Sequence, residues 1–98
     1  MLPPRYQDLS TPLDFAAALE PVHAAVLSLL CAAPRCRDEM HALLARRAYR
    51  PYSIHTVTNA LSLLWRLGLA QRTPAHGYFL TPLGEAVQDA LWHIEEAA

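Results

Sequence analysis

The 98-residue chain contains no lysine, since all eight of its Lys+Arg residues are arginine, and it has only two cysteines and three glycines. Two cysteines cannot form the disulfide framework of a small secreted protein. Three glycines leave no glycine-rich loop that could hold a nucleotide phosphate. The five histidines are scattered, and no nucleophile stands near an orienting acid at a recognisable spacing. The sequence therefore argues against an enzyme and predicts no bound cofactor.

Long apolar runs are also lacking. The most apolar stretch, residues 22–33, lies between Pro21 and Pro34 and is too short to cross a bilayer. Residues 1–20 carry charged side chains where a signal peptide would be apolar. With 53% hydrophobic residues, a chain of this length suits one small globular domain. We expect a soluble cytoplasmic protein with no membrane partner.

The net charge of −1 conceals three blocks of unequal charge. Residues 1–34 hold one arginine against three acidic residues, and residues 77–98 hold four acidic residues and no arginine. Residues 35–76 hold seven arginines against two acidic residues, a local charge of +5. A basic middle between acidic ends indicates an anionic partner for the central segment.

Apolar residues recur at helical spacing in three successive segments. The first covers residues 21–33, with Pro21 suited to a helix start and Pro34 to its end. The second covers residues 37–48, and the third covers residues 54–67 after an N-cap at Ser53. Gly68 stands where a left-handed residue ends a helix. We expect the buried face of the third helix to consist of Ile54, Val57, Leu61, Leu64 and Leu67.

The remaining segments predict a hairpin, a last helix and an N-terminal extension. Residues 69–73 and 77–81 flank a turn and are typical of a two-stranded hairpin. Thr81-Pro82 is typical of a helix start. Residues 1–20 form either an arm or a short helix capped at Thr11, outside a main domain of residues 21–98. The fold class is mainly helical with a small β-hairpin, in the order helix-helix-helix-strand-strand-helix.

Two motifs in the central segment have a familiar form. Leu67-Gly68-Leu69 ends the third helix, and Leu80-Thr81-Pro82-Leu83-Gly84 opens the last one. Together with Thr56-Val57-Thr58-Asn59-Ala60-Leu61, they resemble the winged helix-turn-helix transcription regulators of the MarR-like and PadR-like families, in a minimal version. The resemblance implies a homodimeric repressor of transcription. It would read double-stranded DNA with helix 54–67 and contact the backbone with the wing, residues 69–81.

The outer face of helix 54–67 supports this interpretation without the resemblance. Short polar side chains at the start of a helix can lie close to the floor of the major groove. Asn59 can pair bidentately with adenine, which is worth roughly 1–3 kcal/mol of discrimination. The arginines would contact phosphates on either side. The candidate DNA-binding residues are Arg46, Arg47, Arg50, Ser53, His55, Thr56, Thr58, Asn59, Ser62, Arg66, Arg72 and His76.

Other interpretations stay open. The same fold can serve as a protein–protein interaction module without DNA binding, using Trp65, Trp92 and the acidic last helix. Trp92 with Leu13 and Phe15 would suit a dimer interface. A metal or redox sensor is a weaker hypothesis that uses cysteine and histidine side chains near the first two helices: Cys31, Cys36, His23 and His41. The operator sequence and any small-molecule effector cannot be read from the sequence.

Overall fold

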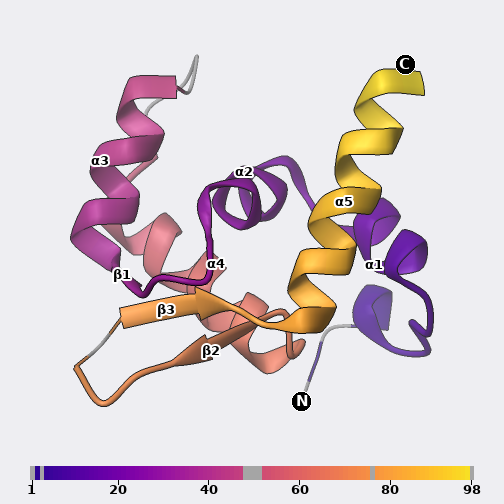
Figure 1. The fold of residues 1–98 in the computed structure, drawn as a ribbon, viewed down its shortest axis with the longest axis horizontal. Coiled ribbons are helices and arrows are strands. Elements are labelled where there is room, and N and C mark those ends of the chain that lie inside the picture. Colours follow the sequence, from indigo (N-terminus) through magenta and orange to yellow (C-terminus); the bar gives the residue numbers. More distant parts are fainter. Residues whose placement is uncertain (1, 3, 48–51, 76, 98) are drawn as a thin grey trace.

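The computed structural model describes residue 2 and residues 4–47, 52–75 and 77–97. Within them the fold is mainly helical, with a small three-stranded antiparallel sheet at one edge (Figure 1). No helix in these residues is long and apolar enough to cross a membrane. The elements in chain order are the 3-10 helix η1 (Pro4–Tyr6), α1 (Pro12–Ala18), α2 (Pro21–Leu29), β1 (Arg35–Cys36), α3 (Arg37–Arg47), α4 (Ile54–Arg66), β2 (Ala70–Arg72), β3 (Gly77–Leu80) and α5 (Pro82–Ala97).

Helix α4 lies within one residue of its predicted bounds because both of its ends carry local signals. The Ser53 side chain accepts a hydrogen bond from the Thr56 amide at 3.1 Å, which caps the first turn. At the other end Gly68 adopts φ +80°, and the Leu69 amide donates to the Leu64 carbonyl at 2.9 Å. These bonds form a Schellman motif, which requires a left-handed residue such as glycine.

The end of α4 and the start of α5 are joined by one hydroxyl group. Thr81 Oγ1 donates to the Gly68 carbonyl at 2.7 Å and accepts from the Gly84 amide at 3.0 Å. A Cβ atom on Gly84 would overlap the carbonyl oxygen of Leu69. The two motifs noted in the sequence are therefore halves of one junction between the central helix and the last helix.

The core lies where α2, α3 and α4 meet, with the sheet and α5 closing it. Helix α4 contributes four side chains with no exposed surface, Val57, Ala60, Leu61 and Leu64, spaced so that one face of the helix points inward. Among the described residues the largest fully buried side chains are Leu27, Met40, Leu61, Leu64, Leu69, Val26, Val57 and Val87. Ile54, expected on this buried face, is only partly buried because it lies in the first turn.

The N-terminal residues take the helical alternative and belong to the same core. Thr11 and Asp14 form a capping box at the start of α1, which packs beside α5 (Figure 1). Tyr6, Phe15 and Leu19 are buried in the common hydrophobic cluster. Phe15 is therefore buried within the protomer and is not exposed for a contact with a second copy.

The sheet has one strand more than the hairpin that the sequence predicts. Strand β1 pairs with β3, with Arg35 opposite Tyr78 and Cys36 opposite Gly77, and gives the order β1-β3-β2. A two-residue strand is too short to show an alternating apolar pattern, so the prediction of a two-stranded hairpin missed it. Its pairing places the start of α3 beside the hairpin.

Helix α2 ends at Leu29, four residues before the predicted end at residue 33. Its last carbonyl groups bind side chains instead of continuing the helix. The Gln88 side-chain amide donates to the Leu27 and Leu30 carbonyls at 2.9 and 3.1 Å, and Arg35 donates to the Leu29 carbonyl at 2.8 Å. These partners let the chain turn toward β1 with its backbone polar groups satisfied.

Candidate nucleic-acid interface

Four polar side chains form a continuous row on the side of α4 that faces away from the core. His55, Asn59 and Arg66 are exposed and Ser62 is partly buried. Their spacing of four, three and four residues places them on one helix face. We call this row the α4 outer row. It brings together four of the residues that the sequence predicts to contact DNA.

Three other predicted contacts on α4 are engaged in the helix itself. Ser53 and Thr56 share the N-cap, with their hydroxyl oxygens 3.0 Å apart. Thr58 Oγ1 donates to the Ile54 carbonyl at 2.8 Å. These hydroxyl groups stabilise the first turn, and their donor capacity is largely used there. Their role as DNA contacts stays a prediction.

Arg72 of β2 is fixed against the helix by an aromatic ring. Its guanidinium carbon lies 4.0 Å from the centre of the Trp65 ring, a cation–π contact between β2 and the last turns of α4. Trp65 is 38% exposed, so its ring serves as a surface platform for the arginine. The contact orders the Arg72 side chain while leaving its N–H groups free to bind an anion.

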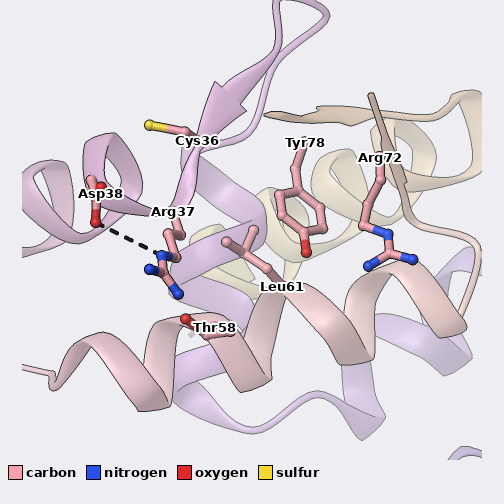
Figure 2. A pocket seen from close by; sticks show the side chains of 7 residues that line it. All are labelled: Cys36, Arg37, Asp38, Thr58, Leu61, Arg72 and Tyr78. Carbon is pink, nitrogen blue, oxygen red and sulfur yellow. Dashed lines mark ion pairs between the residues drawn. The ribbon is translucent and has the colours of Figure 1, made fainter. Parts of the chain in front are cut away.

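An open pocket of about 450 Å³ lies between the start of α3, the face of α4 and the sheet (Figure 2). In Figure 2 the side chains of Arg37, Tyr78 and Arg72 all extend toward α4, with Tyr78 between the two arginines. Leu61 and Thr58 line the pocket from α4. Sequence reasoning missed Arg37 and Tyr78, because only the β1–β3 pairing brings them beside the helix.

The α4 outer row and Arg72 come from a segment without acidic residues. No Asp or Glu occurs between Glu39 and Glu85. The ion pairs among the described residues are Arg5–Glu20, Arg35–Glu39 and Arg37–Asp38, so Arg66 and Arg72 are in none of them. Their charges are therefore available to an external anion.

Arg47, at the end of α3, lies at a different pocket from that of Figure 2. Arg47 lines a second pocket, of about 400 Å³, between α2 and α5, where Asp89 and Trp92 are also found. This pocket shares no lining residue with the pocket of Figure 2. Arg46 is exposed in the last turn of α3. The predicted contacts Arg50 and His76 lie outside the described residues.

The cysteine and histidine residues that suggested a metal sensor are not assembled into a site. His41 Nε2 is 2.8 Å from the Tyr52 carbonyl, and His23 Nδ1 is 3.4 Å from the Tyr6 hydroxyl. Cys31 is partly buried, while Cys36 is exposed on β1. Within the part of the chain that the structure describes, no three His, Cys, Asp or Glu side chains are grouped to hold a metal ion.

Comparison with protein-family models, with curated proteins and with solved structures finds no match for this chain.

Proposed function

We propose that the protein is a winged-helix regulator that binds double-stranded DNA through the outer face of α4. The observation that carries the proposal is the α4 outer row with the Trp65-held guanidinium of Arg72 beside it, on a segment free of acidic residues. The chain order α2-β1-α3-α4-β2-β3 with sheet order β1-β3-β2 is compatible with this fold. In that arrangement α4 is the recognition helix and the β2–β3 hairpin is the wing.

Each residue of the site has a chemical role in this proposal. Asn59 offers a donor and an acceptor that match the major-groove edge of adenine, and His55 and Ser62 can hydrogen-bond to neighbouring base edges. Arg66 and Arg72 bind phosphates on either side of the groove. Bound at a promoter, the protein would exclude the transcription machinery, and we therefore propose that it is a repressor. We also propose that it acts in the cytoplasm as a homodimer.

The test is selection from a random pool of DNA duplexes, followed by binding of the selected site at several salt concentrations. We expect enrichment of a short sequence and an affinity that falls with salt, by ~0.9 in log affinity per log unit for each phosphate contact. If the protein binds no DNA at low salt, the proposed function is wrong.

An interaction module is the second candidate, and one observation favours it. Trp92 is 62% exposed and stands beside the pocket between α2 and α5, where a partner protein could cover it. A protein that binds no DNA at low salt, but forms a hetero-complex that Trp92→Ser abolishes, would have this function instead.

A further inference from the structure

Three hydrogen-bond donors from three separate elements meet at the pocket of Figure 2. Arg37 comes from the start of α3, Arg72 from β2 and Tyr78 from β3. No hydrogen bond joins the Tyr78 hydroxyl to any described residue, and Arg72 is held in place by Trp65. Two guanidinium groups around one hydroxyl give a concave surface that carries positive charge and several free N–H and O–H donors.

We propose that this pocket holds one phosphate group of the DNA backbone, bound jointly by Arg37, Arg72 and Tyr78. The inference rests on the proposed function and adds two contact residues, Arg37 and Tyr78, to the α4 outer row. A phosphodiester offers acceptor oxygens on more than one side, which suits donors that come from several elements. The pocket is open to solvent on one side and larger than a phosphate group, so a backbone phosphate can enter it.

The floor of the pocket is partly apolar, which favours a charged hydrogen bond on that side. Leu61 lines it and is fully buried, and the ring of Tyr78 forms part of its wall. Charged hydrogen bonds are stronger where apolar groups exclude water. Thr58 contributes shape only, because its hydroxyl already donates to the Ile54 carbonyl.

Asp38 is the one acidic residue among the described residues that line the pocket, and it makes the proposal easier to test. Its carboxylate is 3.9 Å from Arg37 Nε, and both side chains are well exposed, at 80% and 61%. A pair of this kind is weak and leaves the other N–H groups of Arg37 free. A phosphate in the pocket is repelled by this carboxylate, so Asp38→Asn is expected to tighten DNA binding for every sequence.

The experiment is a double-substitution cycle measured by fluorescence anisotropy with a labelled duplex of mixed sequence. The variants are Arg37→Gln, Arg72→Gln and the combination, with Tyr78→Phe as a milder third change. Losing one phosphate contact is expected to weaken binding roughly eightfold at 0.1 M salt, and to lower the salt slope by ~0.9. Because both arginines would bind one phosphate, the loss in the double variant should fall well short of the product of the single losses.

Arg5→Gln is the matched control, since Arg5 is an exposed arginine on η1 that pairs with Glu20 away from the pocket. It removes the same charge and should leave the salt slope unchanged. If Arg37→Gln behaves like Arg5→Gln while the parent binds DNA, the pocket assignment is wrong and the proposed function stands. If the loss of affinity in the double variant equals the product of the two single losses, the two arginines do not share one phosphate, and the proposal is also overturned.

Titration with inorganic phosphate separates the two possible sources of the anion. We expect no saturation at micromolar phosphate, since a backbone group gains its affinity from the rest of the duplex. Saturable binding of free phosphate in that range, lost in Arg37→Gln, would identify a site for a small phosphorylated ligand and overturn the proposal. Failure of the parent to bind DNA at all would overturn it together with the proposed function.

Discussion

At the scale of single residues, the proposed function gives base recognition and backbone binding to different side chains of the α4 outer row. Asn59→Ala removes the bidentate side chain, so the preference for the selected site over a mixed sequence is expected to fall by roughly 1–3 kcal/mol. Arg66→Gln should weaken binding to both sequences by similar factors, because a phosphate contact carries no base information. Competition binding with the two duplexes measures both effects. Equal loss of preference in the two variants would mean that α4 does not lie in the groove as proposed.

The sequence alone assigned Arg47 to the same backbone contacts, and that assignment stays a prediction. Arg47 lines the pocket between α2 and α5. A helical pattern tells which residues share a face of α3. It does not tell which neighbouring helices that face meets, since this depends on tertiary packing.

His23 gives a prediction for the pH dependence of stability. Burial lowers the pKa of His23 below its usual value of 6.5, partly offset by the nearby Glu20 carboxylate, which raises it. The unfolded chain therefore takes up a proton at higher pH than the folded protein does. The stability that comes from the neutral imidazole is complete above about pH 6.5 and is lost as the pH falls through the lower, folded-state pKa.

Thermal unfolding at a series of pH values tests this effect. The melting temperature of the parent should fall more steeply below pH ~6.5 than that of His23→Gln, which cannot be protonated. His55→Gln, exposed on α4, controls for removal of an imidazole. Parallel profiles for the parent and His23→Gln would contradict the assignment. The groups facing His23 are Tyr6, Arg5 and Glu20, so the difference between the two profiles isolates this cluster from other carboxylates.

At the scale of elements, the junction between α4 and α5 leaves no room for a side chain at Gly84. Gly84→Ala places a Cβ atom on the Leu69 carbonyl oxygen, which is backbone and cannot turn aside. We expect a loss of roughly 1–3 kcal/mol in unfolding free energy, despite the better helix propensity of alanine. Gly68→Ala meets no neighbouring atom and is strained only by its φ of +80°, at a cost of about 1–2 kcal/mol.

Urea denaturation of the two glycine variants provides the measurement. Both should be less stable than the parent, and the DNA affinity of Gly84→Ala should also fall if α5 and the hairpin move together. A Gly84→Ala variant as stable as the parent would contradict this prediction. It would show that α5 can move away from the Leu69 carbonyl at no cost in unfolding free energy.

The elements with local signals were predictable, and those set by distant partners were not. Ser53 and Gly68 mark the ends of α4 in the sequence, and Thr81-Pro82 marks the start of α5. Helix α2 ends early because Gln88, about sixty residues away in the chain, occupies its final carbonyl groups. Strand β1 exists through its pairing with β3 alone. Consequently the sequence predicted the α4 outer row but not Arg37 and Tyr78, which depend on that pairing.

At the scale of the whole molecule, a net charge of −1 coexists with a strongly basic middle segment. The acidic residues of α5 all come after the hairpin in the chain, and no Asp or Glu occurs between Glu39 and Glu85. Opposite charges on different parts of one small protein favour a defined orientation toward DNA, because the acidic part is repelled by the phosphates. The total charge therefore gives no measure of affinity for nucleic acid.

The dimensions of the molecule lead to a last prediction, on the spacing of the DNA site. The principal extents are 30 × 30 × 24 Å, and successive turns of the major groove are about 34 Å apart. Two copies side by side can therefore place their α4 helices in adjacent grooves. Trp92 and Leu13, 62% and 58% exposed, are the large apolar side chains most available for the contact between copies.

Selection on random DNA should accordingly return two inverted half-sites about 10 base pairs apart, and sedimentation should give the mass of a dimer. Trp92→Ser is expected to yield a monomer that still selects the single half-site, since α4 is unchanged. Leu2→Ser, a change of a partly buried side chain on the other end of the chain, is the control and should remain dimeric. A parent that sediments as a monomer and selects one half-site would contradict the predicted dimer. The whole DNA contact would then be made by α4 and the hairpin of a single protomer.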